Sequence, residues 1–140
     1  MEALCRLSQT YAPLLGRILL SFIFLQSANE KIFHFPQTVA LMNSKGIPMA
    51  EVLLVPTIII LLGGGLMLLF GWYARWGALA LFVFMVPATL FFHSYWTYPE
   101  AQQLNQFHHL TKNIAIMGAL LIILGIGSGP LSLRSGVEKK

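Results

Sequence analysis

Two kinds of residue are scarce in this 140-residue sequence: cysteine and charged side chains. The single cysteine, Cys5, excludes an internal disulfide and any Cys-x-x-Cys redox pair. Charged residues make up 10% of the chain, whereas an average soluble domain contains about 25%. The net charge of +4 comes from lysines and arginines scattered among the predicted helix ends. Because these cations form no stripe, a nucleic-acid partner is not expected.

Apolar residues, by contrast, are abundant. They make up 56% of the sequence, and the mean hydropathy is +0.72. A soluble domain of this length buries only about two-thirds of the surface that its unfolded chain exposes. The apolar side chains must therefore face a bilayer. The length leaves room for one domain, which spans residues 1–140.

Four apolar stretches predict transmembrane helices over residues 12–33, 48–70, 74–95 and 107–127. A helix needs about 20 residues to cross a bilayer core. The stretches are continuous, whereas strands of a membrane barrel alternate in polarity. The expected fold is therefore an all-α membrane protein, a four-transmembrane-helix bundle.

The connection between the first two of these helices predicts a short interfacial helix. Pro36 suits the first turn of a helix, and residues 37–44 supply about two more turns. We expect Val39, Leu41 and Met42 to rest on the membrane.

The first apolar stretch also has features of a signal peptide. Arg17 interrupts its apolar core, and Gln26 is large for its place before a cleavage site. These departures favour an uncleaved helix.

Basic residues predict the orientation. With four spans, one side of the membrane holds both termini and the loop at residues 71–75. That side carries Arg6, Arg17, Arg75, Arg134, Lys139 and Lys140, and the other side carries Lys31, Lys45 and Lys112. The positive-inside rule then places both termini in the cytoplasm of a bacterial cell.

Polar residues gather toward the predicted outer side, where helices one and three end and helix four begins. A lone charge at this depth costs several kcal/mol, so these side chains need partners or a ligand. The candidate ligand-binding residues are Glu30, Lys31, His93, His109, Lys112 and Asn113. They predict a pocket for a quinone headgroup, a small anion or a lipid. The alternative is that each residue marks the water boundary, with the lysines reaching toward the headgroups.

Four histidines raise the question of a metal. His108 and His109 are adjacent and point about 100° apart on a helix, so they do not readily bind one ion together. No metal site is predicted. The sequence contains no glycine-rich phosphate loop, nucleophile elbow or zinc-binding helix motif. No catalytic residue is therefore assigned.

Short motifs recur in a characteristic order along the chain. They are Gly16-Arg17-Ile18-Leu19-Leu20, Glu30-Lys31-Ile32-Phe33, Gly46-Ile47-Pro48, Gly64-Gly65-Leu66, Phe70-Gly71 with Arg75, the run from Ala88 to Trp96, Lys112-Asn113-Ile114-Ala115, and the run from Gly127 to Leu133. In this order and spacing, the sequence resembles the DoxX family of small four-helix bacterial membrane proteins, over roughly residues 15–133.

The resemblance implies an inner-membrane fold and an association with redox biology. Relatives include a subunit of a thiosulfate:quinone oxidoreductase and members of a membrane complex linked to superoxide and thiol stress. One position departs from the family pattern. Many members carry a glutamate near the middle of the second span, where this chain has Ile60. A carboxylate at that depth is a natural proton carrier, and its absence argues against proton transfer by this chain alone.

Three functional hypotheses follow. The first is an accessory subunit of a redox-linked or thiol-stress-linked complex, with no activity by itself. The second is a catalytic quinone-linked oxidoreductase subunit, and the third is a small transporter or assembly factor. The expected partners are the lipid bilayer, redox protein subunits and, through the glycine-rich faces, a second copy of the chain. Quinone is the one cofactor considered, and no covalently bound cofactor is expected.

Overall fold

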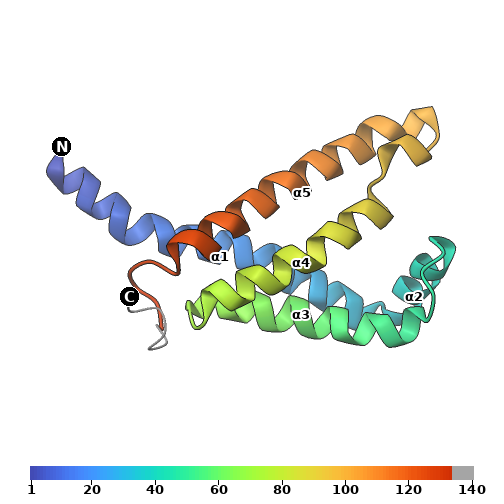
Figure 1. The fold of residues 1–140 in the computed structure, drawn as a ribbon, viewed down its shortest axis with the longest axis horizontal. Helices are drawn as coiled ribbons and strands as arrows, with labels where there is room; N and C mark the ends of the chain where they lie inside the picture. The colour runs from blue at the N-terminus through green and yellow to red at the C-terminus, as the bar shows by residue number, and fades with distance from the viewer. Residues whose placement is uncertain (134–140) are drawn as a thin grey trace.

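The computed structural model of the protein describes residues 1–133. This part contains no strand. Its elements, labelled in Figure 1, are α1 (Glu2–Phe33), α2 (Phe35–Ser44), α3 (Ala50–Phe70), α4 (Ala74–Phe92), the short 3₁₀ helix η1 (Tyr95–Thr97) and α5 (Glu100–Ile126). The predicted all-α fold is confirmed. Arg134, Lys139 and Lys140, which entered the orientation argument, lie outside the described residues.

The four helices α1, α3, α4 and α5 are long and apolar enough to cross a membrane. Two of them extend beyond the predicted bounds. Helix α1 begins at Glu2 rather than at residue 12, and α5 begins at Glu100 rather than at residue 107. These added turns are more polar than the spans that they extend. Hydropathy marks the part of a helix that lies in lipid, and the helix itself continues to the next cap or turn.

The short helix α2 has Pro36 in its first turn, as expected. Its apolar side chains do not all rest on the membrane. Val39 and Met42 are buried, and they pack with Ala50 and Leu54 of α3. Leu41 is exposed, as predicted, but the same prediction was wrong for Val39 and Met42. The helix therefore folds back onto α3.

The four spans pack in sequence order. Helix α1 packs on α3, α3 on α4, and α4 on α5. Helices α1 and α5 are thus the first and last members of this packing order. The end that holds α2 and η1 is called here the α2 end. The opposite end holds the α3–α4 turn and the segment 127–133, and it is called the Gly71 end.

Glycines bring the central helices close together, because a residue without a side chain lets another helix approach. A Cβ added to Gly64 would lie 2.6 Å from Cγ of Leu81 on α4, and one added to Gly65 would lie 2.9 Å from Cδ2 of Leu25 on α1. From the other side, a Cβ on Gly77 would lie 2.7 Å from Cβ of Met67. The main core lies around these contacts and includes Phe24, Leu61 and Leu120.

Two arginines tie the helices together at the Gly71 end. Arg17 of α1 is 2% exposed. Its Nη2 donates to the carbonyl of Leu131 at 2.8 Å, and its Nη1 donates to that of Leu68, in the last turn of α3, at 3.4 Å. Arg75 of α4 donates to the carbonyl of Gly125, in the last turn of α5, at 3.4 Å. Helix C-termini carry partial negative charge, so cations are stabilising there.

A glycine makes room for the first of these arginines. Gly71 ends α3 with φ +68, a left-handed conformation that favours glycine. A Cβ at this position would lie 2.0 Å from Nη1 of Arg17. The Phe70-Gly71 motif and Arg17 are therefore parts of one contact, although they are far apart in the sequence.

Candidate functional site

A cluster of polar side chains lies between α4 and α5 near the α2 end. The rings of His93 and His109 stack with their centroids 5.0 Å apart and their planes 18° from parallel. Nδ1 of His93 lies 2.9 Å from Oε1 of Gln106. Nδ1 of His109 lies 3.3 Å from Nζ of Lys112. These four residues are called here the histidine cluster.

Helical spacing explains why the cluster forms. Gln106, His109 and Lys112 recur every third residue of α5, so they lie along one side of the helix. His93 follows the last residue of α4, and its N–H donates to the carbonyl of Thr89 at 2.9 Å. Because α4 packs on α5, the end of α4 places His93 against this row.

The hydrogen bonds give the two imidazoles opposite roles. A lysine ammonium only donates, so Nδ1 of His109 accepts and its proton is on Nε2. The Gln106 carbonyl oxygen only accepts, so Nδ1 of His93 donates. In the neutral ring, Nε2 of His93 is then an acceptor. The stacked pair thus offers one N–H donor and one nitrogen acceptor side by side.

A second polar pair lies one turn deeper in the same seam. Nδ2 of Asn113 donates to Oγ1 of Thr89 at 3.1 Å. Thr89 is 3% exposed, and Asn113 is half-buried. A buried amide without a partner is costly, so this bond fixes how α5 sits on α4 beneath the cluster.

We expect Asn113→Leu to lower the free energy of unfolding by about 1–3 kcal/mol, because the Thr89 hydroxyl then loses its interhelical partner. The Thr89→Val variant and the double variant complete a double-mutant cycle, followed by denaturation in detergent. A coupling energy near zero would contradict a direct bond between the two side chains.

The six candidate residues of the sequence analysis fall into two groups. His93, His109, Lys112 and Asn113 lie together on the α4–α5 seam. Lys31 and Glu30 lie at the end of α1, which packs on α3. Nζ of Lys31 donates to Oγ of Ser27 at 2.9 Å, within its own helix, and Glu30 is exposed. Ligand binding by any of the six stays a prediction.

Two residues of the seam were missed in the sequence, Gln106 and Thr89. A signal for both was present. Gln106 precedes His109 by three residues, and Thr89 precedes His93 by four, so each shares a helix face with a residue that was chosen. Within residues 1–133, no three His, Cys, Asp or Glu side chains gather closely enough to hold a metal ion.

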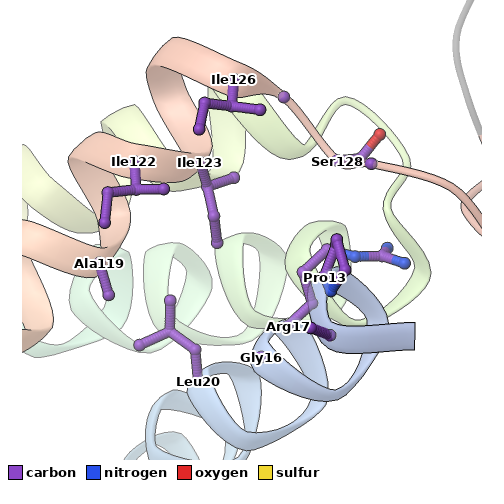
Figure 2. A pocket seen from close by; sticks show the side chains of 12 residues that line it. Pro13, Gly16, Arg17, Leu20, Ala119, Ile122, Ile123, Ile126 and Ser128 are labelled. Carbon is purple, nitrogen blue, oxygen red and sulfur yellow. The ribbon is translucent and has the colours of Figure 1, made fainter. Parts of the chain in front are cut away.

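A cavity lies elsewhere, between α1 and α5 toward the Gly71 end (Figure 2). Its walls include Leu20, Ala119 and Ile123, so it is largely apolar. On α5, His109 and Ile123 are separated by almost four helical turns. The histidine cluster and this cavity are therefore separate features of the molecule.

Four apolar spans with a polar seam between two of them define a small multi-pass membrane protein. Comparison with known proteins then gives the family. The DoxX family model matches residues 12–94, and the chain belongs to the DoxX family.

Two relatives come from Escherichia coli (strain K12). Inner membrane protein YqjF is 31% identical over 128 residues, which cover 91% of this chain and 92% of the relative. Inner membrane protein YphA is 25% identical over 120 residues, which cover 86% of each chain. No solved structure matches the chain.

Proposed function

We propose that this DoxX-family protein is an accessory subunit of a redox-linked complex in the inner membrane, and that it holds a quinone headgroup at the histidine cluster. The observation that carries the proposal is the stacked pair of imidazoles with opposite hydrogen-bonding roles. The redox-linked complex is the part that the family resemblance supports.

Quinone chemistry suits this pair. The carbonyl oxygen of a quinone accepts hydrogen bonds, and Nε2–H of His109 and the Lys112 ammonium are donors. The hydroxyl of the reduced form also donates, and Nε2 of His93 is a matching acceptor. A flat ring also stacks favourably on aromatic faces. Tyr95 and Phe107, which meet edge to face at 5.4 Å, supply such faces beside the cluster.

An accessory role fits the placement of the carboxylates better than a catalytic one. Ile60, near the position where many members of the family carry a glutamate, packs against the main core. The four glutamates of the described part, Glu2, Glu30, Glu51 and Glu100, are all exposed. None of them is a buried proton carrier in the centre of a span, so electron and proton transfer would rest on another subunit.

Replacing His93 by phenylalanine tests the proposal. The variant keeps a flat ring to stack on His109 and removes both ring nitrogens. We expect the purified protein to lose most of its reduced quinone (quinol), extracted under anaerobic conditions and quantified per protein, because the acceptor of the quinol hydroxyl is gone. His108→Phe is the matched control, since His108 is exposed and adjacent to the cluster. Equal quinol content in wild type and His93→Phe, or none in the wild type after loading with quinol, would reject the site.

We also propose that both termini face the cytoplasm. The basic asymmetry supports this orientation. A green fluorescent protein fused after Lys140 should fluoresce, and alkaline phosphatase fused there should be inactive. The two reporters should give the opposite results when fused after Ser44, on the predicted outer side. An active phosphatase at the C-terminus would reverse the orientation.

A further inference from the structure

The cavity between α1 and α5 is lined by residues of two membrane spans. It has a volume of about 290 Å³. Helix α1 contributes Ala12, Pro13, Gly16, Arg17 and Leu20, and α5 with the residues after it contributes Ala119, Ile122, Ile123, Ile126, Gly127, Ser128 and Gly129. In Figure 2, Ala119 and Ile123 point from α5 toward Leu20 on α1. Apart from Arg17 and Ser128, the side chains are hydrocarbon.

The helices around the cavity indicate which class of molecule it can bind. Both walls are helices long and apolar enough to cross a membrane, so the cavity lies at the depth of the lipid hydrocarbon. A hydrocarbon chain is much thinner than an α-helix, whose diameter with side chains is about 10–12 Å. It is the part of a lipid that such an apolar space admits.

The direction of that chain follows from the polar end of the cavity. Ser128 is 3% exposed, and its Oγ lies 3.0 Å from Oγ of Ser132. Two cations lie at this end: Arg17, which lines the cavity, and Arg75, whose Nε would lie 3.3 Å from a Cβ added to Gly127. A positive end favours an anionic headgroup, and phosphate is the anionic group of membrane lipids.

We propose that the cavity between α1 and α5 binds one acyl chain of an anionic phospholipid, with its headgroup at the Gly71 end beside Ser128. The chain runs along α5 from Ile126 toward Ala119 and fills the space that α1 and α5 leave between them. This site is independent of the quinone site, which lies near the other end of α5.

Two substitutions fill the cavity. A Cβ added to Gly16 meets no atom within 4 Å, so Gly16→Leu places its side chain in open space. Ala119→Phe fills the facing wall. The matched control is Gly118→Phe, because a Cβ on Gly118 also meets nothing within 4 Å and Gly118 does not line the cavity.

The measurement is native mass spectrometry of protein purified in mild detergent and reloaded with phosphatidylglycerol. We expect the wild type and Gly118→Phe to retain one phospholipid per chain at activation energies that strip the others. Gly16→Leu and Ala119→Phe should lose it. Retained lipid in both cavity variants would overturn the proposal, and so would a lipid-free dimer in the wild type. Equal retention of phosphatidylcholine would overturn the part that assigns an anionic headgroup.

Discussion

Replacing Arg17 by methionine should lower the free energy of unfolding by about 2–4 kcal/mol, because two carbonyl groups lose a charged donor at once. Arg17 is buried and binds the carbonyls of Leu68 and Leu131. It therefore connects α1 with the end of α3 and with the C-terminal segment. The measurement is denaturation of the purified protein in detergent, followed by circular dichroism.

Arg17→Lys is the informative companion. It keeps the positive charge, but one ammonium on a flexible stem lacks the planar fork that reaches both carbonyls. We expect it to recover only part of the lost stability. Wild-type stability in Arg17→Met would show that the guanidinium contributes little, and that apolar packing alone holds this end together.

Replacing Gly77 by valine should also lower the free energy of unfolding. A Cβ here would lie 2.7 Å from Cβ of Met67 and 3.1 Å from the backbone oxygen of Gly64. The backbone of α3 cannot move aside without separating the two helices, so we expect a loss of about 1–3 kcal/mol. The same denaturation experiment measures it.

Gly118→Val is the matched control for this substitution. It makes the same chemical change within a span, at a position where an added Cβ meets nothing within 4 Å. We expect its stability to stay within about 0.5 kcal/mol of wild type. Equal losses in the two variants would mean that helix propensity, rather than the close α3–α4 contact, sets the cost.

Much of the fold could be predicted because lipid imposes a simple rule on sequence. Each span must be a long apolar helix, so hydropathy located all four. Pro36 predicted α2 because proline suits the first turn of a helix. Hydropathy could not place the first residue of α1 or α5, since their outermost turns lie beyond the apolar segment.

The candidate site was harder to predict. Depth in the membrane can be counted along each helix, so Lys31 and His93 were correctly predicted to lie near helix ends on the α2 side. For Lys112 this prediction was wrong, because α5 begins at Glu100 and Lys112 lies more than three turns inside it. Which helices pack together depends on side-chain shape across the whole bundle. Helix α5 packs on α4, and α1 packs on α3. The sequence therefore could not show that Lys31 lies apart from His93 and His109.

Arg17 and Arg75 show the same limit at the other end. Their partners are backbone carbonyls, and every residue has a carbonyl. No sequence pattern therefore marks Leu68, Leu131 or Gly125 as acceptors. The contact between Gly71 and Arg17 likewise depends on the fold, because the two residues are far apart in the sequence.

The most direct test of the quinone proposal follows the four histidines of the protein in nanodiscs by nitrogen-15 NMR during titration with a short-chain quinone. His34 and His108 are exposed and lie outside the cluster, so they serve as internal controls. We expect the ring nitrogens of His93 and His109 to shift with saturation, while those of His34 and His108 stay unchanged. Shifts of equal size at all four histidines, or none at His93 and His109, would contradict a quinone site at the histidine cluster.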